Sequence, residues 1–244
     1  MAEWFESWFE SEEYLNVYKH RDEKEARLLV ESILSITKIR EKSKILDLAC
    51  GAGRHSIEFA KKGFELTAVD LSKNLLDAAK KNAEAINIKV NFIRADLRKF
   101  KSNEKFDLVL NLFTSFGYFN NDEDNFKVFK TAYHHLMDNG FFIFDYLNKN
   151  HLERNLISET VNSFENVEII QKRKIIDGRV IKEIVIKKNG NEKIFNESVK
   201  IYSKEELLEN LEKLGFKILN IFGSFDKTEF DKNLSDRIII IAQK

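Results

Sequence analysis

Short apolar runs alternate along the chain with stretches in which apolar residues recur every three or four positions. The short runs predict buried strands, and the recurring spacing predicts helices that bury one face. Strand and helix in alternation are typical of a parallel sheet covered by helices on both sides. The pattern therefore predicts an α/β fold, with strands at 45–48, 65–69, 90–95, 106–112 and 141–146 and helices from 22, at 56–62, from 72 and at 122–137.

The pattern changes after residue 150. Residues 164–176, 180–187 and 193–202 read as three strands whose apolar and polar positions alternate, as in strands with one covered face. Asp177-Gly178 and Asn189-Gly190 separate these runs, and both dipeptides favour tight hairpin turns. We therefore expect a small antiparallel sheet inserted after the fifth strand of the core.

The last forty residues return to the core pattern. Ser203 and Glu206 form a capping box that predicts the start of a helix, and Gly215 predicts its end. Residues 216–222 and 237–242 are then the last two strands of the sheet. The fold class that follows is α/β: a doubly wound, Rossmann-like, seven-stranded mixed sheet with an inserted antiparallel β cap.

Composition narrows the class of protein. The 244 residues contain 40 lysines and arginines and 40 aspartates and glutamates. Because the chain has no excess of basic residues, we expect no nucleic-acid partner. A single cysteine, Cys50, excludes an internal disulfide and fits a reducing cytoplasm. The acidic N-terminus lacks a signal-peptide pattern, and no apolar run is long enough to cross a membrane. We expect a cytoplasmic protein, monomeric or homodimeric.

The run from Lys44 to Asp70 carries the clearest chemistry. A strand ends at a turn containing Gly51 and Gly53, a short helix follows, and the next strand ends in Asp70. Glycines let the backbone turn sharply and approach a ligand, and a strand-end carboxylate accepts hydrogen bonds from both ribose hydroxyls. A nucleoside-containing ligand is the main interpretation, and a plain structural turn is the alternative.

The runs DLACGAGRHS, VDLS, RADLR and NLFTSFGYF resemble the class I S-adenosylmethionine-dependent methyltransferases, in particular the small-molecule members with a DLACGTGRH turn. One departure is Ala49, which replaces the first glycine of the general motif and which that subgroup accepts. The resemblance implies S-adenosyl-L-methionine as cofactor, a small-molecule acceptor, and a cofactor-binding set of Tyr14, Tyr18, Arg21, Asp47, Ala49, Gly51, Gly53, Arg54, Asp70, Leu71, Asp96, Leu97 and Leu112.

The resemblance also implies an organisation of the chain. Residues 1–43 are expected to form an N-terminal lid and helices, 44–150 the cofactor-binding core, 151–202 the cap, and 203–244 the last helix and closing hairpin. Aromatic residues Trp4, Phe5, Trp8 and Phe9 repeat at helical spacing. They indicate either an amphipathic segment packed on the domain or an aromatic lid that favours the cationic sulfonium.

The acceptor site is less defined by the sequence. The aromatic loop from Phe113 to Phe119 follows the fourth strand, at the edge where ligands bind open α/β sheets, although it also fits a core role. The expected substrate-binding residues are Phe113, Phe116, Tyr118, Tyr146, Arg173 and Tyr202.

No residue is assigned as a catalytic base. Cys50 is explained by the need for a small side chain in the turn. His134 and His135 are adjacent on a helix, point apart and lack a third ligand, so we expect surface residues and no metal site. Two other functions stay open: a dinucleotide oxidoreductase, although Ser56 stands where its motif has a third glycine, and a non-catalytic S-adenosylmethionine-binding protein.

Overall fold

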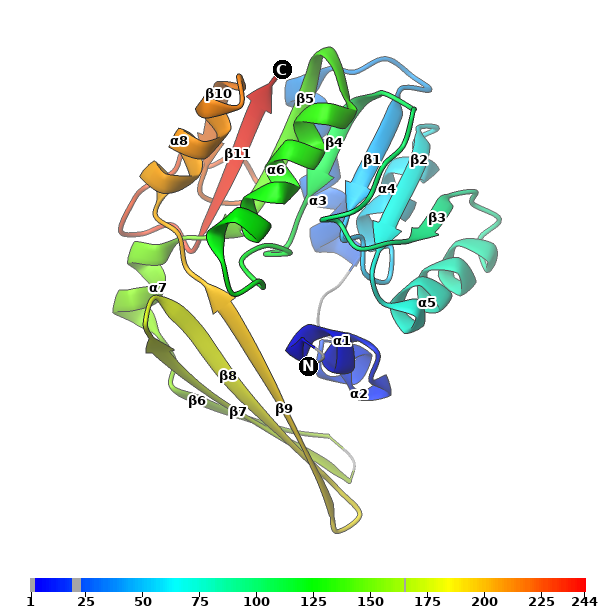
Figure 1. Cartoon of the computed structure of the whole chain (residues 1–244). Helices are drawn as coiled ribbons and strands as arrows, with labels where there is room; N and C mark the ends of the chain where they lie inside the picture. Colours follow the sequence, from blue (N-terminus) through cyan, green and yellow to red (C-terminus); the bar gives the residue numbers. More distant parts are fainter. Residues whose placement is uncertain (1–2, 19–22, 165) are drawn as a thin grey trace.

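One mixed sheet of seven strands forms the centre of the protein. The computed structural model describes residues 3–18, 23–164 and 166–244. The strand order is β10-β11-β5-β4-β1-β2-β3, with β11 antiparallel to both neighbours and β1 to β5 parallel (Figure 1). The predicted fold class is therefore confirmed. The strands are β1 Lys44–Leu48, β2 Glu65–Asp70, β3 Asn91–Arg94, β4 Phe106–Asn111, β5 Leu136–Leu147, β10 Lys217–Phe222 and β11 Arg237–Gln243.

Helices cover both faces of this sheet because alternate residues of each buried strand point to opposite sides. On β1, Leu46 packs with the cluster that contains Phe129 of α6 and Leu207 of α8, whereas Ile45 packs with the cluster that contains Leu29 of α3 and Phe59 of α4. The core helices are α3 Glu23–Thr37, α4 Arg54–Lys61, α5 Lys73–Glu84, α6 Asp122–His135 and α8 Lys204–Lys213.

Helix α6 ends earlier than predicted, and its last residue is not on the surface. Leu136 already belongs to β5, so the helix stops at His135. The His135 side chain is buried: its Nε2 accepts from the Ser102 N–H at 3.0 Å, and its Nδ1 lies 2.7 Å from the Thr131 carbonyl oxygen. The expectation of a surface residue was wrong, because the loop before β4 covers this end of the helix.

The inserted segment is an antiparallel sheet of four strands, ordered β6-β7-β8-β9. The predicted first strand at 164–176 was wrong at its start, because Phe164 pairs with Val167 and the chain forms a hairpin there. This hairpin was not predictable from the sequence pattern, because β6 is mostly exposed and so shows no apolar alternation. A short helix α7, Lys149–Asn155, precedes strands β6 Glu159–Phe164, β7 Val167–Ile176, β8 Arg179–Lys188 and β9 Asn191–Lys200.

The two predicted hairpin turns of the cap are confirmed. Asp177 and Gly178 have φ values of 50° and 68°, and Asn189 and Gly190 have 51° and 79°. Left-handed backbone at both central residues matches the right-handed twist of the flanking strands. The pairing register that these turns set places Lys182 opposite Glu197 on neighbouring strands.

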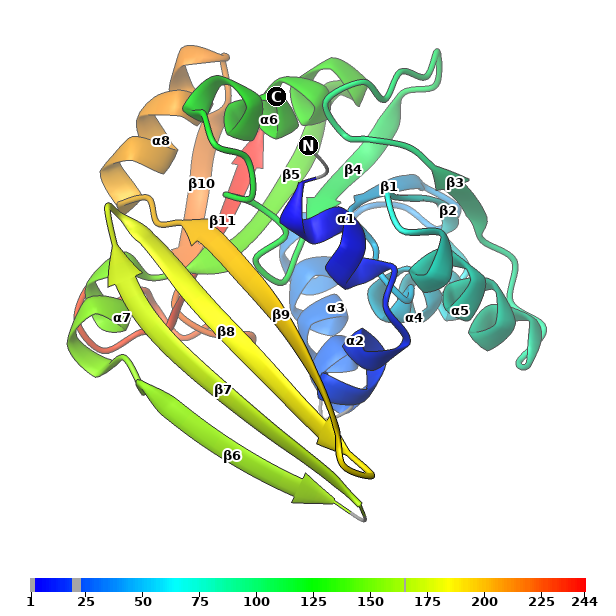
Figure 2. The ribbon, with the colours of Figure 1, turned by 60° about the horizontal axis from the view of Figure 1, so that its bottom comes forward.

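Two short helices, α1 Trp4–Phe9 and α2 Glu12–Val17, lie between the core and the cap (Figures 1 and 2). We call residues 3–18 the lid segment. It shares an apolar cluster with the cap, in which Trp8 and Val17 pack with Ile169, Ile184 and Ile186. The lid segment is therefore attached to the inserted sheet as well as to the core.

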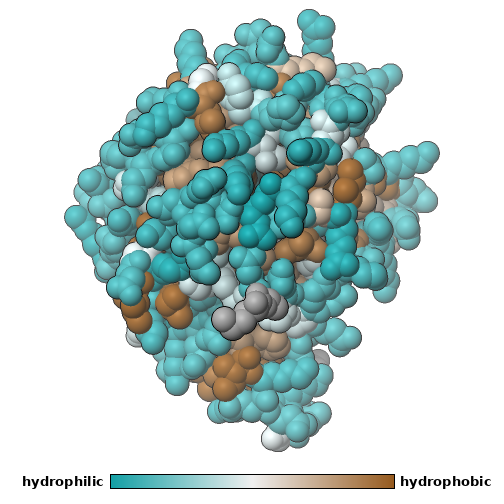
Figure 3. Space-filling model, viewed as in Figure 1, coloured by the Kyte–Doolittle hydropathy of each residue, from teal (hydrophilic) through white to brown (hydrophobic). Residues whose placement is uncertain are grey.

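The face of the molecule in Figure 3 is mostly hydrophilic, and its hydrophobic patches are small and separated. Across residues 3–18, 23–164 and 166–244, no helix combines the length and apolar character that a membrane crossing requires.

Candidate functional site

A crevice opens where the parallel strands end, beneath the lid segment. Its larger part has a volume of about 490 Å³, which lies in the range of small-molecule sites. The strand order reverses between β1 and β4, and open α/β sheets bind ligands at this kind of switch point. The glycine turn after β1, the aromatic loop after β4, the lid segment and strands β8 and β9 of the cap all contribute to its walls.

The glycine turn after β1 is held by the acid at the end of β2. Asp70 accepts a hydrogen bond from the Gly51 N–H at 2.7 Å and another from the Ser72 N–H at 2.9 Å. Gly53 has φ of 78°, and an added Cβ would lie 3.0 Å from the Ala79 Cβ. Glycine is therefore required at position 53 both by the backbone and by packing.

Burial raises the pKa of Asp70, although the backbone N–H groups of Ser72 and Gly51 oppose this effect. The carboxylate still lines the crevice. Each of its oxygens has a second lone pair beyond the backbone bond. Asp70 thus fits the ribose hydroxyls that the motif implied, while it also fixes the turn.

Asp47 lies near the floor of the crevice, on β1. Burial raises its pKa to about 6, while a 2.5 Å hydrogen bond from the Ser56 hydroxyl opposes this rise. Ser56 stands where a dinucleotide fingerprint would have its third glycine. The Ser56 hydroxyl donates to the Asp47 carboxylate, and this hydrogen bond is a physical reason for serine rather than glycine at position 56.

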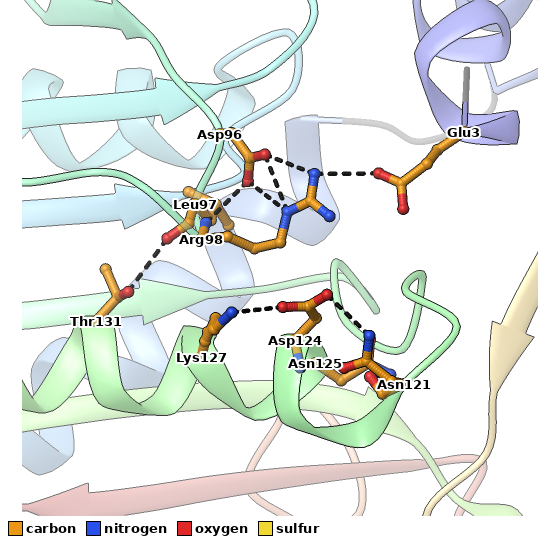
Figure 4. A network of polar contacts seen from close by, with 9 residues as sticks. All are labelled: Glu3, Asp96, Leu97, Arg98, Asn121, Asp124, Asn125, Lys127 and Thr131. Atoms are coloured by element: carbon orange, nitrogen blue, oxygen red, sulfur yellow. Dashed lines mark hydrogen bonds and ion pairs between the residues drawn. The ribbon is translucent and has the colours of Figure 1, made fainter. Parts of the chain in front are cut away.

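Asp96 follows the end of β3 and forms an ion pair with Arg98 of the same loop (Figure 4). The Arg98 guanidinium donates to both Asp96 oxygens at 2.6–3.0 Å and contacts Glu3 of the lid segment at 3.1 Å. Burial opposes ionisation of Asp96, but the hydrogen bonds and charge of Arg98 outweigh it, so its pKa lies below the usual range. The resemblance placed Asp96 in the cofactor-binding set, whereas its ion pair with Arg98 was not predicted.

A second group of polar contacts in Figure 4 fixes the start of α6 below the crevice. The Asn121 side chain caps the helix by accepting from the Asp124 N–H at 2.7 Å. Asn125, which lines the crevice, accepts from the Phe119 N–H and donates to the Phe119 carbonyl. The aromatic loop is therefore tied to α6 at its far end.

The start of the aromatic loop is held by Asp145 of β5. Phe113 and Thr114 both have left-handed backbone, with φ of 60° and 63°. The Phe113 N–H donates to the Asp145 carboxylate at 2.7 Å, and the Thr114 N–H donates to the Asp145 carbonyl at 3.1 Å. Such a conformation persists in non-glycine residues only where surrounding contacts impose it.

The cap holds the other side of the same loop. The Arg179 guanidinium donates to the carbonyl oxygens of Gly117, Tyr118 and Phe119 at 3.1–3.3 Å. Gly117 has φ of 87°, and its carbonyl accepts from the Lys200 N–H at 2.7 Å. The loop is thus part of a rigid wall shared by core and cap.

Most of the predicted site residues line the crevice. These are Tyr14, Tyr18, Asp47, Ala49, Gly51, Arg54, Asp70, Leu71, Asp96, Leu97, Leu112, Phe113, Phe116 and Tyr118. Arg21 lies outside the described residues, so its role stays a prediction. Gly53 lies behind the turn, against Ala79 and Phe92.

Three predicted acceptor residues lie away from the crevice lining. Tyr146 is buried and donates its hydroxyl to the Lys200 carbonyl. Tyr202 belongs to the core, where its hydroxyl donates to Asp122 at 2.6 Å. The Arg173 guanidinium donates to the side chains of Thr160 and Gln171 within the cap itself. In the structure these three side chains therefore stabilise the core and the cap, and none of them lines the crevice.

Other residues also line the crevice. Phe5 and Phe9, from the aromatic pattern that indicated either packing or a lid, line its inner part. Lys182, Glu197 and Arg237 line its outer part and were not predicted. The charged pair of the cap had a signal in the sequence, since Lys182 and Glu197 stand at inward positions of two strands whose register follows from the Asn189-Gly190 turn. Lys and Glu are rarely buried unless they are paired, so charged residues at covered positions of a sheet indicate an ion pair.

The environment of Cys50 disfavours a role as nucleophile. Burial raises the pKa of the Cys50 thiol well above its ordinary value, and Asp70 and Asp47 raise it further, so a thiolate nucleophile is disfavoured. Among the residues that the structure describes, no three His, Cys, Asp or Glu side chains are grouped as metal ligands.

Comparison with known proteins agrees with this geometry. Residues 45–140 match the family described as a methyltransferase domain. The provisionally named methyltransferase YqeM of Bacillus subtilis is 36% identical over 106 residues, which are 43% of this chain and 42% of YqeM. The 23S rRNA (uracil(747)-C(5))-methyltransferase of Pyrococcus abyssi is 42% identical over 72 residues, 29% of this chain and 18% of that protein. The match thus spans less than half of either relative.

Solved structures match nearly the whole chain. An S-adenosylmethionine-dependent methyltransferase from Clostridium acetobutylicum has a TM-score of 0.80 at 22% identity and covers 94% of this chain and 95% of its own. CalS10, an amino pentose methyltransferase from Micromonospora echinaspora solved with S-adenosylmethionine bound, has a TM-score of 0.72 at 18% identity over 96% and 97% of the two chains. At these identities the structures establish the fold. Together with the methyltransferase-domain match and the similarity to YqeM, they confirm the resemblance to class I S-adenosylmethionine-dependent methyltransferases.

Proposed function

We propose that this class I S-adenosylmethionine-dependent methyltransferase domain transfers a methyl group to a small-molecule acceptor bound between the aromatic loop and the cap. The observation that carries the proposal is the joint arrangement of the glycine turn and Asp70 beneath an aromatic lid. When bound, S-adenosylmethionine would supply the methyl group of its sulfonium, with the neutral thioether S-adenosylhomocysteine as leaving group, so positioning would carry much of the catalysis.

The residues of the crevice fit this cofactor. Asp70 offers acceptors for the ribose hydroxyls, and Leu71 and Leu97 offer apolar surface beside it. Phe9 and Tyr14 of the lid present aromatic surface to the same space, which favours a cationic group. Asp96 shares its carboxylate with Arg98 and keeps further lone pairs that can accept from the adenine amine.

A small acceptor is favoured over a polymer by the enclosure of the crevice. The lid, the aromatic loop and the cap strands surround the outer part, which Val180, Lys182 and Val199 line from the cap. CalS10 is an amino pentose methyltransferase, whereas the Pyrococcus abyssi relative acts on 23S rRNA. The zero net charge of this chain supports the first of these acceptor classes.

The two other functions are the alternatives that experiment has to separate from this proposal. A dinucleotide oxidoreductase is disfavoured, because Ser56 is committed to Asp47 and the antiparallel strand β11 occupies the position beside β5. A non-catalytic binding protein would keep the same cofactor site without transfer. Binding measurements with S-adenosylmethionine, S-adenosylhomocysteine and NAD(H) separate the first alternative from our proposal.

The deciding experiment uses labelled methyl groups. The purified chain is incubated with methyl-labelled S-adenosylmethionine and either a small-metabolite extract or total RNA, and the label is followed into each fraction. Label in the metabolite fraction supports the proposal, and substitution of Val199 by Phe, which fills the outer crevice, should then abolish it. Label only in RNA, or tight cofactor binding without any transfer, contradicts it.

A further inference from the structure

A buried charged pair connects the cap to the lid. Glu197 on β9 faces Lys182 on β8, and their Oε2 and Nζ atoms lie 2.6 Å apart. The two side chains are only 12% and 14% exposed. A buried ion pair of this kind gives little net stability over an apolar pair of similar size, so stability alone does not account for it.

Two residues of the lid segment donate to the same carboxylate. The Trp8 Nε1–H lies 2.7 Å from Glu197 Oε1, and the Tyr18 hydroxyl lies 2.5 Å from the same oxygen. Lys182 Nζ in turn lies 2.5 Å from the Tyr18 hydroxyl. One carboxylate of the cap therefore binds α1 through Trp8 and the C-terminal end of α2 through Tyr18.

The surroundings of this junction are apolar. Trp8 is 1% exposed and packs on Phe195 of the cap, with ring centroids 4.4 Å apart. Ile169, Ile184 and Ile186 complete the cluster. In such an environment each hydrogen bond to a charged acceptor is worth more than at the surface, and an unsatisfied donor is costly.

The same lid segment forms a wall of the cofactor crevice. Phe5, Phe9 and Tyr14 line the part that contains Asp70 and Asp96, whereas Trp8 does not line it. Trp8 lies one residue before Phe9 on α1, so a change in the direction of α1 moves both side chains. Glu197 lines the outer part of the crevice but not the inner part that contains Asp70 and Asp96, so an effect of Glu197 on the inner part passes through the lid.

We propose that Glu197 is a positioning residue for the cofactor site: through Trp8 and Tyr18 it holds the lid over the glycine turn. This inference rests on the proposed function, because it takes the crevice beneath the lid as the S-adenosylmethionine site. It assigns the cap a second task beside acceptor binding. Substitutions in the cap, a separate sheet, thereby change cofactor affinity.

The test removes the charged pair without leaving an unpaired buried charge. Lys182→Met together with Glu197→Met keeps side chains of similar length and apolar packing, so we expect the fold to be retained although Trp8 and Tyr18 lose their acceptor. S-adenosylhomocysteine affinity, measured by calorimetry, should fall tenfold or more in this double variant and also in Glu197→Gln. A matched control changes the exposed pair of β7 and β8, Glu168→Gln with Lys187→Gln, and should leave affinity within twofold.

A second measurement separates lid positioning from general loosening. Trp8→Phe removes the indole N–H but keeps an aromatic ring, and should weaken S-adenosylhomocysteine binding in the parent at least threefold. In the Lys182→Met/Glu197→Met background the same change should have no further effect, because the acceptor is already gone. Independent losses that multiply would show two structural defects and overturn the proposal.

The chain carries two tryptophans, Trp4 and Trp8, both on α1. In a Trp4→Phe variant, emission and acrylamide quenching therefore report on Trp8 alone, and quenching should increase when the charged pair is removed. A folded double-methionine variant that binds S-adenosylhomocysteine as tightly as the parent overturns the positioning role. A parent that binds neither S-adenosylhomocysteine nor S-adenosylmethionine instead overturns the proposed function on which it rests.

Discussion

The Asp145 carboxylate accepts two hydrogen bonds from the Arg237 guanidinium, each with an N–O distance of 2.8 Å. Asp145 is completely buried, and its second oxygen also accepts from the Phe113 N–H. The pair therefore joins three elements, β5, β11 and the aromatic loop. It also fixes the backbone from which Phe113 enters the crevice.

Removal of Arg237 should destabilise the protein strongly. Arg237→Ala leaves a buried carboxylate without its counterion, which costs about 3–5 kcal/mol of unfolding free energy. Urea denaturation measures this loss. Lys213→Ala is the control. It removes an exposed ion pair with Glu209 and should change the urea midpoint little. Replacing both partners, with Asp145→Leu and Arg237→Met, should recover part of the loss; equal stability of Arg237→Ala and the parent contradicts this account.

Substitution of Asp70 should weaken cofactor binding. Asp70→Ala removes an acceptor of two ribose hydrogen bonds, and we expect S-adenosylhomocysteine affinity to fall by about 2–3 kcal/mol, with charged-acceptor bonds worth roughly 1.5–3 kcal/mol each and water compensating in part. Since Asp70 also accepts from Gly51 and Ser72, thermal stability should fall too. Glu65→Ala, at the exposed start of the same strand, is the control. Unchanged affinity in Asp70→Ala would show that the acid is purely structural.

Asp47 should make stability depend on pH. Because burial raises its pKa from 3.8 to about 6, the folded state keeps a proton between about pH 4 and pH 6 that the unfolded state releases. The free energy of unfolding attributable to this group therefore falls as pH rises through that window, by up to roughly 3 kcal/mol. Asp47→Asn should remove this part of the dependence.

Urea denaturation of parent and variant near pH 4.5 and near pH 7.5 measures the effect. Asp77→Asn is a suitable control, because the hydrogen bond from Lys73 keeps the pKa of exposed Asp77 below its usual range. If Asp47→Asn and the parent lose the same stability between the two pH values, Asp47 is not the group responsible.

The chain should not bind nucleic acid specifically. Lys plus Arg and Asp plus Glu are equal at 40 each, and binding to RNA or DNA rests on the neutralisation of phosphates by a basic excess. Fluorescence anisotropy with tRNA and with duplex DNA, at low and at moderate salt, should detect no submicromolar complex. A tight, salt-sensitive complex would contradict this and favour an RNA acceptor.

The sequence by itself determined the core of the protein and the centre of its site. Gly51, Gly53 and Asp70 lie within one strand-turn-helix-strand unit, so their arrangement follows from local geometry and from the adjacency of parallel strands. The hairpin turns of the cap were readable for the same reason, because Asp177-Gly178 and Asn189-Gly190 impose their backbone conformation locally.

Only the tertiary structure decided which partner each buried charge would meet. Asp145 and Arg237 are far apart in sequence, as are Trp8 and Glu197, and no local pattern predicts such pairs. The position of β6 was hidden for a related reason, since an exposed edge strand needs no apolar alternation. Pairing of charges and placement of the lid depend on how separate elements pack, and packing is a property of the whole fold.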